Sequence, residues 1–177
     1  KTDLFSKGGT YAGISQITPM AYGTDGGYYY RVQMIDGNYL NREDLTYIGV
    51  NTGAIDFSKQ YIEFKVKLSP NVSNVLYYLL QGNGVNLNSN NHWLNYELKA
   101  TTEWQTVRFE LREFARGNEL THVTFSVKPG AGVTLETFYA DFDQMSVKNY
   151  TAEELEEFAK QEAAKEIEKT DLFSKGG

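Results

Sequence analysis

Residues 61–68 read YIEFKVKL, and apolar and polar side chains alternate over the whole stretch. Successive side chains of a β-strand point to opposite faces of a sheet, so this alternation predicts a strand with one buried face. The residues that we expect in the core are Ile62, Phe64, Val66 and Leu68. The residues between them are expected to face water.

Similar short runs recur along the chain, separated by clusters of Gly, Asn, Asp and Ser that favour turns. They predict about nine strands, at residues 10–18, 27–35, 45–51, 60–68, 75–81, 93–98, 104–111, 120–128 and 136–148. Many short strands with such turns indicate an all-β fold. We therefore expect a β-sandwich of the jelly-roll type, followed by a C-terminal linker helix.

The last predicted strand changes its alternation partway along. Phe138, Ala140 and Phe142 share one parity, whereas Met145 and Val147 take the other. One extra residue in a strand shifts the parity in this way, so we expect a β-bulge near residues 143 and 144.

The composition changes at Thr151, after which the chain is rich in Glu, Ala and Lys. Thr151 and Glu154 have the spacing of a capping box, which starts a helix. An apolar stripe follows, formed by Leu155, Phe158, Ala159, Ala163 and Ile167. A semi-rigid helical spacer of roughly 25 Å is one interpretation. The stripe favours a helix that also leans on one of the domains it joins.

The first nine residues, KTDLFSKGG, reappear unchanged as residues 169–177. The offset of 168 residues is too long for a solenoid repeat, so each unit is expected to be a complete domain in a tandem array. This divides the chain into a β-module (1–150), a helical linker (151–168) and the start of the next repeat (169–177). One explanation of the duplication is an excerpt that ends inside a repeat. The other is that the terminal segment is a strand or clasp that the preceding domain requires, in cis or from its neighbour.

The composition excludes several classes of protein. The chain has no Cys, which removes disulfides and thiol chemistry. A net charge of −6 with dispersed acidic residues argues against nucleic acid, and no apolar run approaches the length of a membrane span. Thirteen Tyr and many Asn and Gly are typical of a β-rich domain that binds through rings and amides.

The residues that catalysis requires are few. His92 and His122 are far apart, and neither belongs to a metal-binding spacing such as HExxH. A pair of carboxylates for glycoside hydrolysis is set in space and leaves no sequence motif. The candidates are Glu63, Glu97 and Glu110, each more simply explained as a solvated strand residue. We therefore expect no enzymatic activity.

A resemblance is visible over residues 56–147, a little over half of the chain. The residues that carry it are DFSK at 56–59, HWL at 92–94, WQTV at 104–107 leading to Phe114 and Arg116, residues 120–127, FYAD at 138–141 and MSV at 145–147. This stretch resembles the jelly-roll carbohydrate-binding modules of the galactose-binding-like superfamily. It is most similar to family eleven, a β-glucan-binding module of cellulolytic bacteria.

The resemblance implies a concave sheet face that binds a glycan chain without catalysis. Sugar rings pack on aromatic faces, and their hydroxyls require Arg, Asp, Asn and Gln as partners. The outward candidates are Tyr29, Arg31, Gln33, Tyr77, Gln81, Trp93, Asn95, Arg108, Arg116 and His122. Arg116 falls where the family places a ligand-binding arginine. Trp104, Tyr28 and Tyr30 are expected in the core instead, and His122 has an alternative as an ordinary surface residue.

These jelly rolls often carry a structural calcium between the N-terminal region and the last strand. Asp141 matches the F-Y-x-D position, and Asp3 or Asp25 is expected to approach it. Calcium requires several carboxylate and carbonyl oxygens, which these residues supply. Alternatively, Asp25 builds a turn with Gly26 and Asp141 caps a sheet edge.

Together these features predict a carbohydrate-binding repeat of a large extracellular or cell-surface bacterial protein. Its expected partners are a polysaccharide, in particular a β-linked glycan, and the neighbouring repeats. The alternative is an adhesin or filament repeat of the same fold that has no glycan site.

Overall fold

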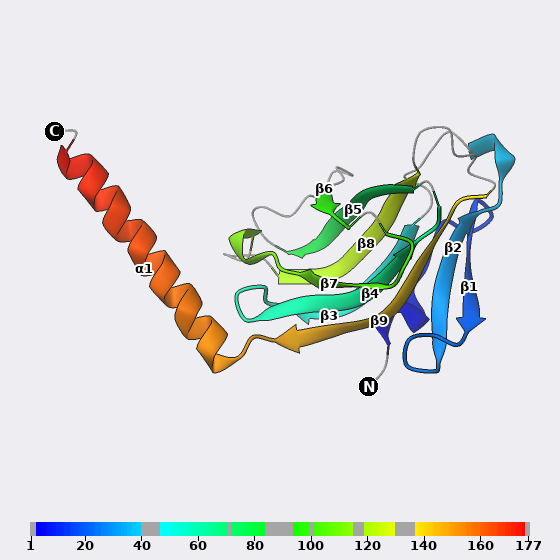
Figure 1. Cartoon of the computed structure of the whole chain (residues 1–177), viewed down its shortest axis with the longest axis horizontal. Coiled ribbons are helices and arrows are strands. Elements are labelled where there is room, and N and C mark those ends of the chain that lie inside the picture. Colours follow the sequence, from blue (N-terminus) through cyan, green and yellow to red (C-terminus); the bar gives the residue numbers. More distant parts are fainter. Residues whose placement is uncertain are drawn as a thin grey trace.

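The computed structural model describes residues 3–39, 47–70, 72–83, 94–99, 101–114, 119–129 and 137–175, and within these it shows a sandwich of two antiparallel sheets (Figure 1). The five-stranded sheet runs in the order β1 (Ser15–Ala21), β2 (Tyr28–Met34), β9 (Tyr139–Asn149), β4 (Gln60–Leu68), β7 (Gln105–Phe109). The four-stranded sheet runs in the order β3 (Tyr47–Ile55), β8 (Glu119–Pro129), β5 (Val72–Asn83), β6 (Leu94–Glu97). The predicted β-sandwich jelly roll with a C-terminal helix is confirmed.

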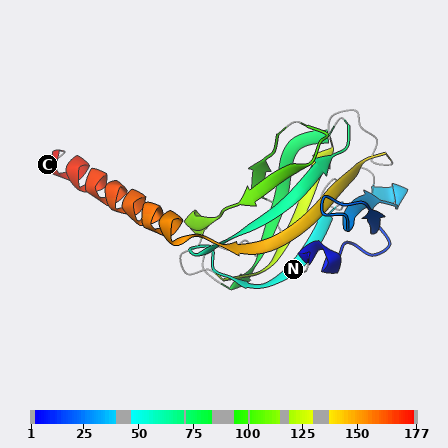
Figure 2. The same ribbon diagram turned by 60° about the horizontal axis from the view of Figure 1, so that its bottom comes forward.

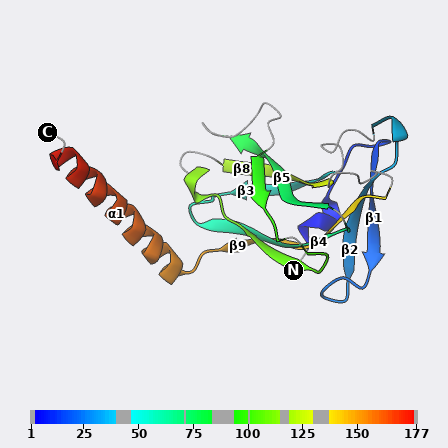
Figure 3. The same ribbon diagram turned by 45° about the horizontal axis from the view of Figure 1, so that its top comes forward.

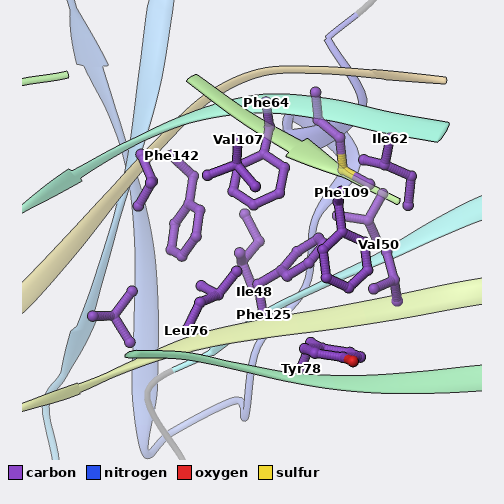
Figure 4. Packing of buried hydrophobic residues seen from close by; sticks show 14 of the residues in the cluster. Ile48, Val50, Ile62, Phe64, Leu76, Tyr78, Val107, Phe109, Phe125 and Phe142 are labelled. Carbon is purple, nitrogen blue, oxygen red and sulfur yellow. The ribbon is translucent and has the colours of Figure 1, made fainter. Parts of the chain in front are cut away.

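The core lies between the two sheets, where aromatic rings from both meet (Figure 4). Phe64 of β4 and Phe125 of β8 have ring centroids 4.6 Å apart, as do Phe109 of β7 and Tyr78 of β5. Offset and edge-to-face contacts of this kind add stability beyond the apolar area that they bury. The four core positions predicted in β4 are all buried.

The predicted bulge in β9 is present, and the N-terminal segment packs against it. The pairing of β4 with β9 shifts between Glu63 and Lys65, and Gln144 has a φ of +53°. The carboxylate of Asp3 accepts hydrogen bonds from the backbone N–H groups of Gln144 and Met145, each at 2.9 Å. We call residues 3–9 the clasp; they include the short 3-10 helix η1 (Leu4–Lys7).

Three expectations about the N-terminal strands and the core were wrong. Tyr28 is 60% exposed at the start of β2, and Trp104 is only half-buried. Trp104 precedes β7 and has the outward parity of that strand, so its ring meets Tyr29 on the outer surface at 5.4 Å. β1 begins five residues later than predicted, because a turn at 12–14 with Gly13 at φ +83° precedes it. Tyr30 is partly buried and packs against the core, as expected.

The helix α1 (Ala152–Lys175) follows β9 and stands out from the sandwich in each view (Figures 1 to 3). The predicted capping box is confirmed: the Thr151 backbone N–H donates to the Glu154 carboxylate, and the Glu154 N–H donates to the Thr151 hydroxyl. The ring of Phe158 packs edge-on against Tyr150 at 4.9 Å, and the guanidinium of Arg112 lies 3.3 Å from its centroid. These contacts join the first turns of the helix to the domain. The helix runs past the predicted linker into the second copy of KTDLFSKGG.

Two further 3-10 turns complete the described elements. These are η2 (Gly37–Tyr39), after β2, and η4 (Arg112–Phe114), after β7. None of the helices in the described part of the chain is long and apolar enough to cross a membrane.

Candidate functional site

The predicted ligand residues do not converge on one face. Tyr29, Arg31 and Gln33 lie on β2 and Arg108 lies on β7, so these four belong to the five-stranded sheet. The others whose strands are described belong to the four-stranded sheet, namely Tyr77, Gln81, Asn95 and His122. Because the sheets pack face to face, their outer surfaces point in opposite directions. Trp93 and Arg116 lie outside the described residues.

The five-stranded face holds a closed ion pair. The residues that form this face are Tyr29, Arg31, Gln33, Trp104, Arg108, Tyr139 and Asp141. The guanidinium of Arg31 donates to both carboxylate oxygens of Asp141, with Nε–Oδ1 at 2.9 Å and Nη2–Oδ2 at 3.1 Å. Asp141 has no exposed area, and Arg31 also stacks over the ring of Tyr139 at 3.8 Å. The hydrogen bond to Asp141 raises the pKa of Arg31. This arginine holds the fold together and has little left to offer a ligand.

Arg108 is similarly engaged. Its guanidinium pairs with Glu110, just after β7, and with Glu154 at the start of α1, and it stacks over the ring of Tyr61 at 4.0 Å. Glu63 in turn pairs with Lys148 at 2.6 Å. Two of the three glutamates considered for hydrolysis are thus bonded to cations. The pair of Arg108 with Glu154 fixes the start of the helix to the sheet.

The four-stranded face has a different character. Pairing along β3, β8 and β5 aligns three rows across the sheet: Asn51, His122 and Gln81; then Gly49, Thr124 and Leu79; then Tyr47, Ser126, Tyr77 and Asn95. Successive rows on one face of a strand lie roughly 7 Å apart. We call this set the four-stranded face. It places the ring of Tyr47, amides and a histidine around a floor of buried residues.

The floor of the four-stranded face is tightly built. Thr124 is 5% exposed and Ser126 has no exposed area, although both point away from the core. A Cβ on Gly49 would lie 3.0 Å from Nε2 of His122 and 3.1 Å from Oγ1 of Thr124, so a larger residue would push both aside. Burial lowers the pKa of His122 below its ordinary value, which favours the neutral imidazole. A neutral imidazole has both a donor and an acceptor nitrogen.

Sequence reasoning missed the members of this face on β3, which are Tyr47, Gly49 and Asn51. The sequence signal was the alternation with apolar Ile48 and Val50, which the structure shows to be fully buried. Tyr47 extends the face, since its ring meets the half-exposed ring of Tyr11 edge-on at 6.2 Å. Burial raises the pKa of the Tyr47 hydroxyl, so this group stays protonated at neutral pH.

The predicted calcium ligands are distributed over two places. Asp3 and Asp25 line one pocket of about 250 Å³ together with Gln144, whereas Asp141 is bonded to Arg31. Asp25 accepts the backbone N–H of Gly27 at 2.9 Å, which is the turn considered as its alternative. Asp143, two residues after Asp141, receives the backbone N–H and hydroxyl of Thr24 on Oδ2. Its Oδ1 is buried and has no hydrogen-bond partner among the described residues.

Burial raises the pKa of Asp3, although backbone N–H groups of Met145, Phe5 and Gln144 lower it in part. The charge of nearby Asp143 raises it further. A second negative charge beside the Asp3 carboxylate favours a bound cation or proton at this place.

No family model and no curated protein match the chain. Among solved structures, the chain is similar to a CBM4 protein, with 20% identity, a TM-score of 0.40 and coverage of 78% of this chain and 81% of that one. It is also similar to the CBM22-2 xylan-binding domain of Paenibacillus barcinonensis, with 12% identity, a TM-score of 0.43 and coverage of 78% of this chain and 89% of that one. A third is the family 11 carbohydrate-binding module of Clostridium thermocellum in complex with a β-1,3-1,4-mixed-linked tetrasaccharide. It has 12% identity, a TM-score of 0.45 and coverage of 78% of this chain and 86% of that one. Likenesses this distant do not assign a family or a function to the chain.

Proposed function

We propose that this domain binds a polysaccharide without catalysis, through the four-stranded face. The observation that supports this most is the alignment of Asn51, His122 and Gln81 in one row across β3, β8 and β5. Amide and imidazole groups in a row offer donors and acceptors to the hydroxyls along a sugar chain. The row that contains Tyr47 adds a ring surface for the C–H faces of the sugars.

The opposite face is the weaker candidate. Its two arginines, Arg31 and Arg108, are bonded to carboxylates of the domain itself. A glycan that recruited either guanidinium would have to leave Asp141 or Glu154 without its partner. On the four-stranded face the ring of His122 requires no such exchange, because it has no hydrogen-bond partner in the described part of the chain.

The proposal includes a β-linked glycan as ligand and a large extracellular bacterial protein as host. The ligand class follows the resemblance over residues 56–147, and the host follows the duplicated segment and the lack of Cys. We expect affinities of micromolar or weaker, about −8 kcal/mol at most, because an open sheet face gives few ordered polar contacts.

Affinity electrophoresis in gels that contain soluble β-glucans or xylan tests this proposal. His122→Ala and Asn95→Ala should reduce retardation at least about tenfold, since each removes polar contacts from a weakly held ligand. Lys67→Ala, on the five-stranded sheet, is the matched control and should migrate as the unmodified protein. If neither four-stranded variant changes migration in a retarding gel, the face is wrongly assigned. If no glycan retards the unmodified protein, the adhesin or filament alternative takes its place.

We also propose a structural calcium beside the clasp, with Asp143 in place of Asp141. Asp143 has the unpartnered buried oxygen, whereas both oxygens of Asp141 are taken by Arg31. Asp3 would supply the second carboxylate, since among the described residues its Oδ2 accepts only the N–H of Gln144. When bound, the ion would neutralise the two carboxylates and brace the bulge.

A further inference from the structure

Several contacts of the clasp can be made only by the residue type that stands at that position. Asp3 is the N-cap of η1, where its Oδ1 accepts the N–H of Phe5 at 3.0 Å. The same carboxylate accepts the two N–H groups of the bulge in β9, Gln144 and Met145. An aliphatic residue at position 3 would leave these donors unpaired in a partly buried place.

The next residues of the clasp enter the sandwich. The ring of Phe5 is 1% exposed and meets the rings of Phe64 at 5.6 Å and Phe142 at 5.3 Å. A Cβ on Gly8 would lie 2.6 Å from Ile48, so no larger residue fits without a shift. Gly9 exchanges two backbone hydrogen bonds with Gly49 of β3, at 2.8 and 2.7 Å. The clasp thus ties both sheets together.

The second copy of the sequence has every residue that these contacts require. Asp171 and Phe173 correspond to Asp3 and Phe5, and Gly176 and Gly177 correspond to the glycine pair. In this chain residues 169–175 belong to the end of α1. A helix end by itself demands neither a buried phenylalanine nor a glycine that fits against isoleucine. The identity is therefore explained by the clasp and not by the helix.

The second copy is also carried away from its own domain. The 24 residues of α1 span about 36 Å at 1.5 Å per residue, and every side chain from Ala159 to Thr170 is exposed. The N-terminus lies against the sandwich, and the C-terminus lies at the far end of the helix (Figure 1). The clasp position of the same domain is already filled by residues 3–9.

We propose that residues 169–177 dock as a clasp on a second copy of this domain, in place of residues 3–9 of that copy, and that α1 then ends near Thr170. Asp171 becomes the N-cap of a 3-10 turn and bonds the bulge of the second copy, and Phe173 enters its core. Helix ends fray readily, so unwinding the last turn of α1 opposes docking only weakly. The spacer and the clasp form one connected element. This proposal does not depend on glycan binding.

Complementation in trans tests it with the full chain. Phe5→Ala weakens the resident clasp, and a synthetic peptide KTDLFSKGG is then added. At about 100 times its Kd the peptide should raise the Tm by roughly 5–10 °C. The same peptide with its phenylalanine replaced by alanine is the matched control and should have no effect. If Phe5→Ala does not fold, Phe5→Leu is used in its place.

Sedimentation of the same variants gives a second measurement. The Phe5→Ala chain retains an intact second copy, so it should self-associate as concentration rises. Phe5→Ala combined with Phe173→Ala should remain monomeric over the same range. A Tm that the peptide leaves unchanged, together with equal monomeric sedimentation of both variants, would overturn the proposal.

Discussion

Replacement of Arg31 by alanine should destabilise the domain and leave glycan binding intact. The change removes both hydrogen bonds to Asp141, a carboxylate with no exposed area. Breaking a buried pair from one side costs about 3–5 kcal/mol. We expect the lower end, about 3 kcal/mol, because the Arg31 side chain is 25% exposed and Lys67 lies opposite Asp141 in the sheet. For a domain of this size the Tm should fall by roughly 6–12 °C.

The assay combines thermal denaturation with affinity electrophoresis well below the lowered Tm. Lys67→Ala, on the same face, should change stability by less than about 1 kcal/mol, since its contact with the Trp104 ring at 5.9 Å is long. His122→Ala should show the converse pattern, with weakened retention and a smaller loss of stability. An Arg31→Ala protein with unchanged Tm and lost retention would refute the argument and identify the five-stranded face as the binding surface.

Two further predictions concern ions and pH. Millimolar calcium should raise the Tm of the chain and a chelator should lower it, while Asp143→Asn should abolish the response; an unaltered Tm in calcium would contradict the proposed site. The pKa of His122 is depressed by burial, so the unfolded chain binds its proton at a higher pH than the folded one. The contribution of the neutral His122 to the free energy of unfolding should therefore be complete above pH 6.5 and be lost as the pH falls below it. Urea titrations at about pH 7.5 and pH 5 measure this change in the free energy of unfolding. The change should be smaller in His122→Gln, which lacks the titrating group.

The strands were predictable because each carries its signal locally. Residues 60–68 alternate cleanly, and β4 has the predicted bounds. The parity change around Asp143 and Gln144 likewise marked the bulge before any pairing was known. Local alternation states which side chains of one strand face the core. It does not state which of the two sheets the strand joins.

That missing information explains why the predicted site was divided. Arg31 and His122 both have outward parity, yet they lie on opposite surfaces of the sandwich. The partner of Arg31 is Asp141, 110 residues away, and nothing near either residue in the sequence indicates the pair. Trp104 was expected in the core, but its position before β7 gives it outward parity. Pairing between distant strands decides these cases, and one sequence does not contain it.

The clasp and the helix meet the domain on the same strand. Asp3 bonds β9 at its bulge, and α1 continues from the end of β9 at Asn149. β9 lies inside the five-stranded sheet, between β2 and β4, so its hydrogen bonds run across the chain direction on both sides. A pull on the two ends of the domain is consequently borne in shear along one internal strand. Many ladder bonds of the five-stranded sheet then resist together.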